Sequence, residues 1–297
     1  MFTRWRRRGG GEGLECSRRS KRWILNPYLS NGPSARFVGP NAVANRPRSG
    51  RACVLRCCRP MARSDYAIHS VELEIGGSEN VPAIFQVPRA LAPTPGVLLL
   101  HGFSSRKERM ADSIGRALLA HGVASLAIDL PLHGARDGDL QSMSLRNPIA
   151  VAQTWKLAVR EARAAAHYML EQPSVDSRRI AIAGYSLGAY LAVTVASDEP
   201  VVRAVALAAG GDLPSDLPFA SLVRAAVDPV RSVKALSGRP LYMVNGKNDR
   251  TIRPEQAGAL FAAAGDPKEI HWYDGGHWPP QPAIANVAAW LAAQLNP

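Results

Sequence analysis

From residue 66 onward, the pattern of hydrophobic and polar residues predicts strands and helices in alternation. Residues 66–75 and 81–87 alternate with a period of two on both sides of a Gly-Gly-Ser-Glu-Asn turn, which predicts an antiparallel β-hairpin. Residues 97–100 form a short, continuous apolar run, which is typical of a strand buried on both faces. Residues 106–121 then carry apolar residues at helical spacing and are followed by a glycine, where helices commonly stop.

The same alternation continues to the end of the chain. We expect strands at 123–130, 179–185, 201–209, 240–245 and 269–273, and helices at 149–171, 187–197, 254–264 and 282–295. Strands that alternate with helices form βαβ units, so the predicted fold class is α/β, with a mostly parallel twisted sheet, helices on both faces and an N-terminal antiparallel hairpin. The connections 132–148 and 212–239 are unusually long, and we expect the second to be a short lid or pocket-wall insertion.

Residues 1–60 differ from the rest of the chain in charge and composition. They hold 14 basic residues, 2 acidic residues and all four cysteines, whereas residues 61–297 hold 22 basic and 22 acidic residues and no cysteine. The first segment also lacks apolar periodicity. We therefore expect a disordered basic leader at 1–60 and a formally neutral folded domain at 61–297, without disulfides or cysteine-ligated metal.

The leader is open to several interpretations. Its longest apolar run is too short for a secretory signal, but its arginines and serines partly fit an organelle transit peptide. A basic arm for nucleic acid is disfavoured because the rest of the chain is neutral. The interpretation we favour is a segment outside the native protein, with Met61 as the natural start. We accordingly expect a cytoplasmic protein that binds no nucleic acid and, lacking a long uncharged apolar run, no membrane.

A serine stands on a predicted strand-to-helix turn. Gly184-Tyr185-Ser186-Leu187-Gly188 lies between the strand expected at 179–185 and the helix expected at 187–197. Glycines on both sides of a serine allow the sharp bend that exposes its hydroxyl, and the helix N-terminus behind it favours negative charge. Ser186 is therefore the candidate nucleophile. A helix-capping serine in a glycine-rich turn is the alternative.

A base and an acid follow Ser186 in the chain. A serine hydroxyl needs a base to take its proton, and the base needs an acid to orient it. Asp249 follows the strand expected at 240–245, and His277 follows the strand expected at 269–273. Because the carboxyl ends of parallel strands meet at one edge of a sheet, we expect these side chains to meet. The alternatives are a turn-forming aspartate and a loop histidine without a catalytic role.

Acyl transfer also needs two N–H donors that stabilise an oxyanion. The loop His101-Gly102-Phe103 follows the strand expected at 97–100, and one donor commonly comes from such a loop while the other comes from the residue after the nucleophile. We assign the backbone N–H groups of Phe103 and Leu187 to the oxyanion hole. We expect His101 to hold the loop rather than perform chemistry.

Five motifs together resemble the α/β-hydrolase superfamily, in particular its dienelactone-hydrolase-like and prolyl-oligopeptidase-like small serine esterases. They are Leu-Leu-Leu-His-Gly-Phe (98–103), Asp-Leu-Pro-Leu-His-Gly (129–134), Gly-Tyr-Ser-Leu-Gly (184–188), Asn-Gly-Lys-Asn-Asp (245–249) and Gly-Gly-His (275–277). The resemblance covers residues 66–295 and implies an α/β-hydrolase fold. The chain departs from dienelactone hydrolases, which carry a cysteine nucleophile, and from prolyl oligopeptidases, which carry an additional propeller domain.

The resemblance implies a serine hydrolase, with 61–297 as the catalytic domain and a triad of Ser186, Asp249 and His277. We expect it to hydrolyse small to medium acyl esters through an acyl-enzyme. These esters are its expected small-molecule partners. We expect no cofactor or metal. A thioesterase or small amidase would use the same triad, and a non-catalytic ligand-binding relative would keep the pocket without turnover. The candidate pocket residues are Tyr185, Phe219, Leu222 and Trp278.

Overall fold

The computed structural model of the chain describes residues 4–7, 65–75, 80–136, 138, 147–214, 220–236 and 238–296. The strands are β1 (Arg4–Arg7), β2 (Tyr66–Glu74), β3 (Val81–Pro88), β4 (Thr94–Leu100), β5 (Ala124–Ile128), β6 (Val175–Tyr185), β7 (Val202–Ala208), β8 (Leu241–Gly246) and β9 (Lys268–Tyr273). The helices are α1 (Lys107–Met110), η2 (Ala111–Gly115), α2 (Arg116–Leu119), α3 (Pro148–Leu170), α4 (Leu187–Asp198), α5 (Ala220–Ala226), α6 (Pro229–Lys234), α7 (Pro254–Ala263) and α8 (Gln281–Leu295). None of these described helices has the length and apolar character needed to cross a bilayer.

The strands form one sheet in the order β1-β2-β3-β5-β4-β6-β7-β8-β9. β2 and β3 pair as the predicted antiparallel hairpin, and β3 also pairs antiparallel with β5. From β5 to β9 all neighbours are parallel, as expected for strands separated by helices. The carboxyl ends of β4, β6, β8 and β9 therefore lie at one edge of the sheet, where the candidate chemistry of the sequence is also placed.

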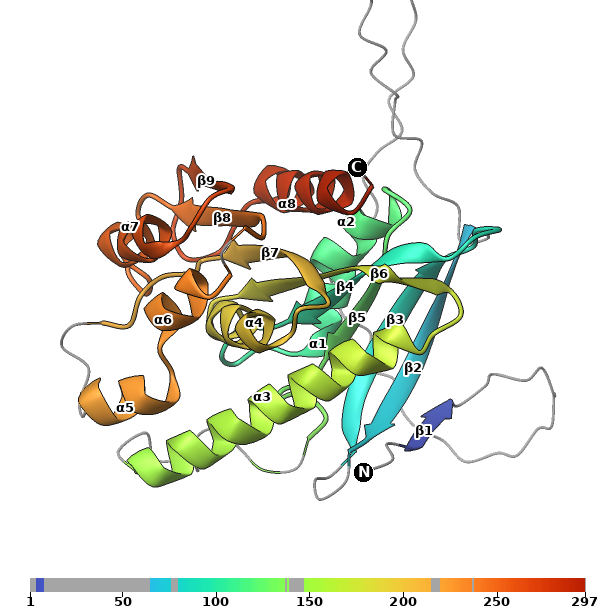
Figure 1. The fold of residues 1–297 in the computed structure, drawn as a ribbon, viewed down its shortest axis with the longest axis horizontal. Coiled ribbons are helices and arrows are strands. Elements are labelled where there is room, and N and C mark those ends of the chain that lie inside the picture. Colours follow the sequence, from blue (N-terminus) through green and yellow to red (C-terminus); the bar gives the residue numbers. More distant parts are fainter. Residues whose placement is uncertain are drawn as a thin grey trace, which may run out of the picture. The chain divides into compact units, whose positions relative to one another are not determined.

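Helices cover both faces of the sheet, and side chains along β4 alternate between two cores. Leu98 and Leu100 pack in a core with residues of α3, α4, α6 and α7, whereas Val97 and Leu99 pack in a core with the helical segment 107–119 and α8. All four side chains are fully buried, which is why β4 reads as an uninterrupted apolar run. Figure 1 shows α3 and α4 lying across the first of these faces.

The predicted elements are confirmed, and the structure contains three features that the prediction lacked. Four residues of the expected disordered leader form β1, an edge strand that pairs antiparallel with β2. The helix expected at 106–121 contains a π-helical turn, η2, in its middle. The connection 212–239, expected as a lid or pocket wall, carries the short helices α5 and α6, and residues 215–219 and 237 lie outside the described residues.

Candidate active site

Ser186 lies on the sharp bend between β6 and α4. Its backbone has φ +52°, in the left-handed region that costs a non-glycine residue free energy. The bend is held by the Ser186 N–H, which donates to the Ala208 carbonyl at 2.9 Å. A Cβ atom on Gly184 would overlap the Gly188 carbonyl, and one on Gly188 would overlap the Leu100 carbonyl. The two glycines therefore let β6, α4 and the end of β4 approach closely at the serine.

The structure brings Ser186, His277 and Asp249 together in one hydrogen-bonded chain. The His277 Nε2 atom lies 2.9 Å from Ser186 Oγ, and His277 Nδ1 lies 2.8 Å from Asp249 Oδ2. Asp249 follows β8 and His277 follows β9, so the two loops meet Ser186 at the carboxyl edge of the sheet. A carboxylate oxygen accepts, so Nδ1 carries a proton and, in the neutral ring, Nε2 can accept the proton of the serine hydroxyl.

The carboxylate of Asp249 is buried and held in place by its own loop. Its Oδ1 atom accepts hydrogen bonds from the backbone N–H groups of Thr251 at 2.8 Å and Ile252 at 3.0 Å. The side chain is fully excluded from solvent. Because the loop occupies Oδ1, Oδ2 is the oxygen that contacts His277. The Asp249 loop therefore sets the orientation of the imidazole.

The loop of His277 is fixed by two tyrosines. The Tyr273 hydroxyl donates to the Gly276 carbonyl at 2.8 Å, and the Tyr185 hydroxyl donates to the His277 carbonyl at 3.4 Å. Burial, together with the negative charge of Asp249, raises the pKa of Tyr273 to about 12. Burial likewise raises the pKa of Tyr185. Both groups consequently remain hydroxyl donors at neutral pH.

The peptide between Gly102 and Phe103 runs beside Ser186. A Cβ atom on Gly102 would lie 3.3 Å from the Ser186 Cβ. The Gly102 carbonyl accepts from His101 Nδ1 at 2.8 Å, and because the C=O and N–H of a trans peptide point in opposite directions, the Phe103 N–H points away from that ring. Neither Phe103 nor Leu187 donates its backbone N–H to any residue in the described part of the chain. The assignment of these two N–H groups to an oxyanion hole stays a prediction.

His101 links the loop after β4 to the loop after β5. The Leu130 N–H donates to His101 Nε2 at 3.1 Å, while Nδ1 donates to Gly102, so the ring is a neutral tautomer with both nitrogens engaged. Burial lowers the pKa of His101 to about 4. The expected structural role of His101 agrees with these contacts.

The lowered pKa of His101 predicts a loss of stability in mild acid. The unfolded chain binds a proton below pH 6.5 and the folded chain only near pH 4, so stability is complete above pH 6.5 and falls as pH falls. Between pH 7 and pH 4.5 this step should remove about 2 to 3 kcal/mol of unfolding free energy. Urea unfolding at both pH values measures it. His101→Gln, which keeps a donor and an acceptor, should show a smaller loss, and equal losses in the two proteins would contradict the assignment.

The structure also contains a buried ion pair, Lys107–Asp129, that the sequence does not predict. Asp129 is fully buried, and its carboxylate accepts from the Lys107 Nζ at 2.7 Å, the Lys107 backbone N–H at 2.8 Å and the Ala135 N–H at 2.9 Å. Gly134 packs against this carboxylate so closely that a Cβ atom would overlap it. The Asp-Leu-Pro-Leu-His-Gly motif thus builds a turn around Asp129, and Lys107 ties that turn to the start of α1.

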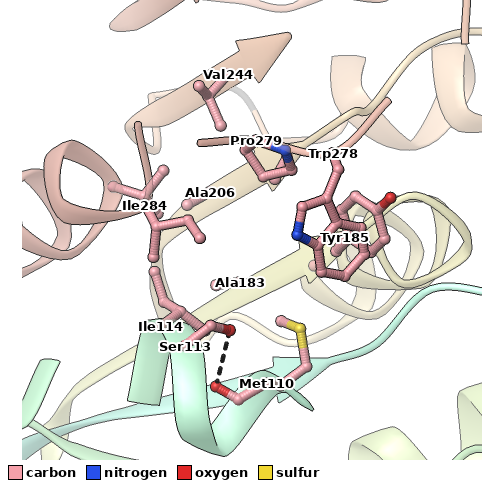
Figure 2. Close-up of a pocket in the computed structure, with 13 residues that line it drawn as sticks. Met110, Ser113, Ile114, Ala183, Tyr185, Ala206, Val244, Trp278, Pro279 and Ile284 are labelled. Carbon is pink, nitrogen blue, oxygen red and sulfur yellow. Dashed lines mark hydrogen bonds between the residues drawn. The ribbon is translucent and has the colours of Figure 1, made fainter. Parts of the chain in front are cut away.

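The predicted pocket residues Tyr185 and Trp278 line a narrow apolar cavity of about 40 Å³ (Figure 2). Their rings pack edge to face with centroids 4.6 Å apart, and the Arg109 guanidinium lies 4.5 Å from the Trp278 ring centre. The cavity lies among η2, α8 and the strands, and Ser186 is not in its wall. These rings therefore support the His277 loop. Phe219 and the side chain of Leu222 lie outside the described residues.

No metal site accompanies this arrangement in the described part of the chain, where no group of three or more His, Cys, Asp or Glu side chains is placed to hold an ion. The groups that the structure brings into contact at the candidate site are a hydroxyl, an imidazole and a carboxylate.

Comparisons with known proteins place the chain in a family. Residues 81–278 match the model of the dienelactone hydrolase family. Polyketide transferase ATR5 of Stachybotrys chlorohalonatus is 28% identical over 182 residues, which are 56% of this chain and 57% of that protein. A cold-adapted esterase from an Arctic intertidal metagenomic library has a TM-score of 0.63 at 20% identity, over 80% of this chain and 97% of that one.

Acetyl xylan esterase 1 from Thermoanaerobacterium sp. has a TM-score of 0.64 at 19% identity, over 80% of this chain and 86% of that one. Likeness at this level of identity shows the shared fold, whereas the family match extends from β3 to the His277 loop and so includes all three residues of the hydrogen-bonded chain. The chain is an α/β-hydrolase and belongs to the dienelactone hydrolase family.

Proposed function

We propose that the chain is a serine hydrolase that cleaves carboxylic esters through an acyl-enzyme. The observation that carries the proposal is the continuous chain of hydrogen-bonding contacts from Ser186 Oγ through His277 to Asp249, with contacts of 2.9 and 2.8 Å. A serine hydroxyl within hydrogen-bond reach of an imidazole, itself oriented by a carboxylate, is the arrangement that activates a serine as a nucleophile.

The first half of the reaction forms the acyl-enzyme. Ser186 Oγ attacks the ester carbonyl carbon while its proton passes to His277 Nε2, and the carbonyl oxygen becomes an oxyanion. The carbon–oxygen bond to the alcohol then breaks, and the proton on Nε2 passes to the departing oxygen. Asp249 holds Nδ1 and stabilises the imidazolium that exists between these two transfers.

The second half repeats the sequence with water. His277 takes a proton from a water molecule that attacks the acyl-enzyme carbonyl, and returns it to Ser186 Oγ as the acid leaves. In both halves the N–H groups of Phe103 and Leu187 stabilise the oxyanion. Removing one such donor commonly costs about 10²- to 10³-fold in rate, so the placement of these two peptides contributes substantially to catalysis.

Serine in place of the cysteine of dienelactone hydrolases makes this chemistry depend on the histidine. A thiol is partly ionised near neutral pH, whereas a serine hydroxyl is not, so Ser186 needs His277 to take its proton during attack. This dependence separates the proposed esterase from a cysteine-based relative.

Thiol reagents should leave the activity of the 61–297 domain intact, because that domain has no cysteine.

A fluorophosphonate probe tests the nucleophile directly. The wild-type chain should be labelled in a single tryptic peptide that contains Ser186, because the probe reacts with serines that an imidazole activates. Ser186→Ala should not be labelled. The matched control is Ser197→Ala, which removes a hydroxyl from the far end of the same helix, where it donates to the Thr194 carbonyl. Equal labelling of wild type and Ser186→Ala would refute the proposal.

A further inference from the structure

A second cavity, of about 260 Å³, is lined by Phe103 and Leu187, whose backbone N–H groups are the proposed oxyanion donors; Ser186 itself belongs to the lining of neither cavity. Residues of α3 and α4, among them Trp155, Ala158 and Leu191, also line it. No residue of the His277 loop lines it. Figure 1 shows α3 and α4 next to each other on one face of the sheet.

The position of His277 decides which part of an ester this cavity receives. The departing alcohol oxygen must lie within reach of His277 Nε2, because that atom returns the proton. The carbonyl oxygen must point at the N–H groups of Phe103 and Leu187. The acyl substituent then lies away from the His277 loop, and the cavity beyond Phe103 and Leu187 is the space available to it.

The wall of the cavity presents carbon almost exclusively. Its one ionisable residue among those described, His133, is neutral because burial lowers its pKa. No Lys or Arg belongs to the described lining, and Arg136, a buried cation three residues after His133, is engaged by Glu161 in contacts of 2.7 and 3.1 Å. A carboxylate on the acyl group would lose its water here without gaining a cationic partner among the described lining residues.

The volume sets the size of the acyl group. An apolar cavity of about 150 Å³ holds a benzene molecule, so 260 Å³ accommodates a six-membered ring with a short linker, or an alkyl chain of similar size. An acetyl group would leave most of this space unfilled. Each methylene that enters the cavity contributes about 0.8 kcal/mol of transfer free energy, so longer acyl groups gain binding until the space is full.

We infer that this cavity is the acyl site, and that the preferred substrates are esters of uncharged apolar acids of about six to eight carbons, linear or with a phenyl ring. The inference rests on the proposed esterase function, whose substrate class it names. It excludes acetyl esters and esters of dicarboxylic acids as the best substrates.

A matched series of p-nitrophenyl esters tests the preference. The wild-type chain should hydrolyse the hexanoate and the phenylacetate with kcat/KM at least about 10-fold above the acetate, because several carbons become buried. The hemisuccinate should fall at least about 10-fold below the butyrate, which has the same chain length without the charge. A series in which the acetate or the hemisuccinate is best would overturn the inference.

Two variants on α3 test the location. Ala158→Leu adds three carbons inside the cavity and should lower kcat/KM for the hexanoate by about 10-fold or more, with a far smaller loss for the acetate. Ala152→Leu adds the same carbons to the same helix, outside the cavity wall, and should leave the hexanoate-to-acetate ratio as it is in wild type. Val151→Phe adds volume at a half-buried residue of the cavity wall and should have the same effect as Ala158→Leu. It provides the test if Ala158→Leu does not fold.

Equal losses for acetate and hexanoate in both cavity variants would place the acyl group elsewhere. If the wild-type chain hydrolyses no ester, the proposed function fails, and the cavity is then tested by binding alone. Calorimetric titration of Ser186→Ala with p-nitrophenyl hexanoate should show an affinity that drops about 10-fold when Ala158→Leu is added. Unchanged affinity would overturn the assignment of the cavity independently of the chemistry.

Discussion

Replacing Ser186 or His277 with alanine should lower kcat for ester hydrolysis by about 10⁴- to 10⁶-fold, and replacing both should be little worse than replacing either. The reason is that the two side chains act as one unit. Without His277 Nε2 at 2.9 Å, the serine hydroxyl keeps its proton during attack, and without the hydroxyl the imidazole has nothing to activate. Only the oxyanion donors and substrate binding remain in all three variants.

Steady-state kinetics with p-nitrophenyl hexanoate measure these losses. His121→Ala is the matched control for His277, because His121 is an exposed histidine on the turn after α2 and should retain wild-type kcat. Far-ultraviolet circular dichroism should show that all variants are folded. Losses that multiply in the double variant would mean that Ser186 and His277 act independently, and the proposed mechanism would then be wrong.

Replacing Asp129 with alanine should lower the free energy of unfolding by about 3 to 5 kcal/mol, which is the usual cost of removing one partner of a buried ion pair. The change removes the buried carboxylate 2.7 Å from the Lys107 ammonium and leaves it only the partly exposed Glu108 carboxylate at 2.9 Å. It also strips acceptors from the Lys107 and Ala135 N–H groups. Urea titration followed by tryptophan fluorescence gives the value.

An exposed ion pair provides the comparison. Asp112 and Arg116 face each other on the helical segment 107–119 with both side chains more than half exposed, and Asp112→Ala should cost less than about 1 kcal/mol. If Asp112→Ala and Asp129→Ala lowered the free energy of unfolding equally, burial would not explain the contribution of the Lys107–Asp129 pair to stability.

Asp129→Ala should also lower kcat in the fraction that stays folded. The turn that Asp129 holds carries Leu130, whose backbone N–H donates to His101.

Periodicity was sufficient to predict the parallel sheet because both of its faces are covered. A strand such as β4 must be apolar on both sides, and a helix such as α3 must be apolar on one, so their patterns are unambiguous. The edge strand β1 contains three arginines among its four residues and has no apolar pattern of its own. The short helices α5 and α6 lie below the length at which a helical period becomes visible.

The three residues of the hydrogen-bonded chain were predictable because topology alone brings loops after parallel strands to the same edge. The Lys107–Asp129 pair was not, because these residues are 22 positions apart and a lysine at the start of a helix ordinarily faces solvent. The choice of Tyr185 and Trp278 as pocket residues stays a prediction. They line one cavity, whereas Ala158 and Leu191 line a second cavity on helices whose contact with each other follows only from packing.

The close approach of Gly188 to the end of β4 has a consequence for how new specificities arise in this scaffold. The bend at Ser186 admits no side chain at positions 184 and 188, so a substitution at either glycine should displace Ser186. The proposed acyl cavity is lined in part by α3, so substitutions such as Ala158→Leu should change the acyl preference without altering these glycines. Relatives and engineered variants that prefer esters of other acids are therefore expected to differ in the α3 residues that line this cavity.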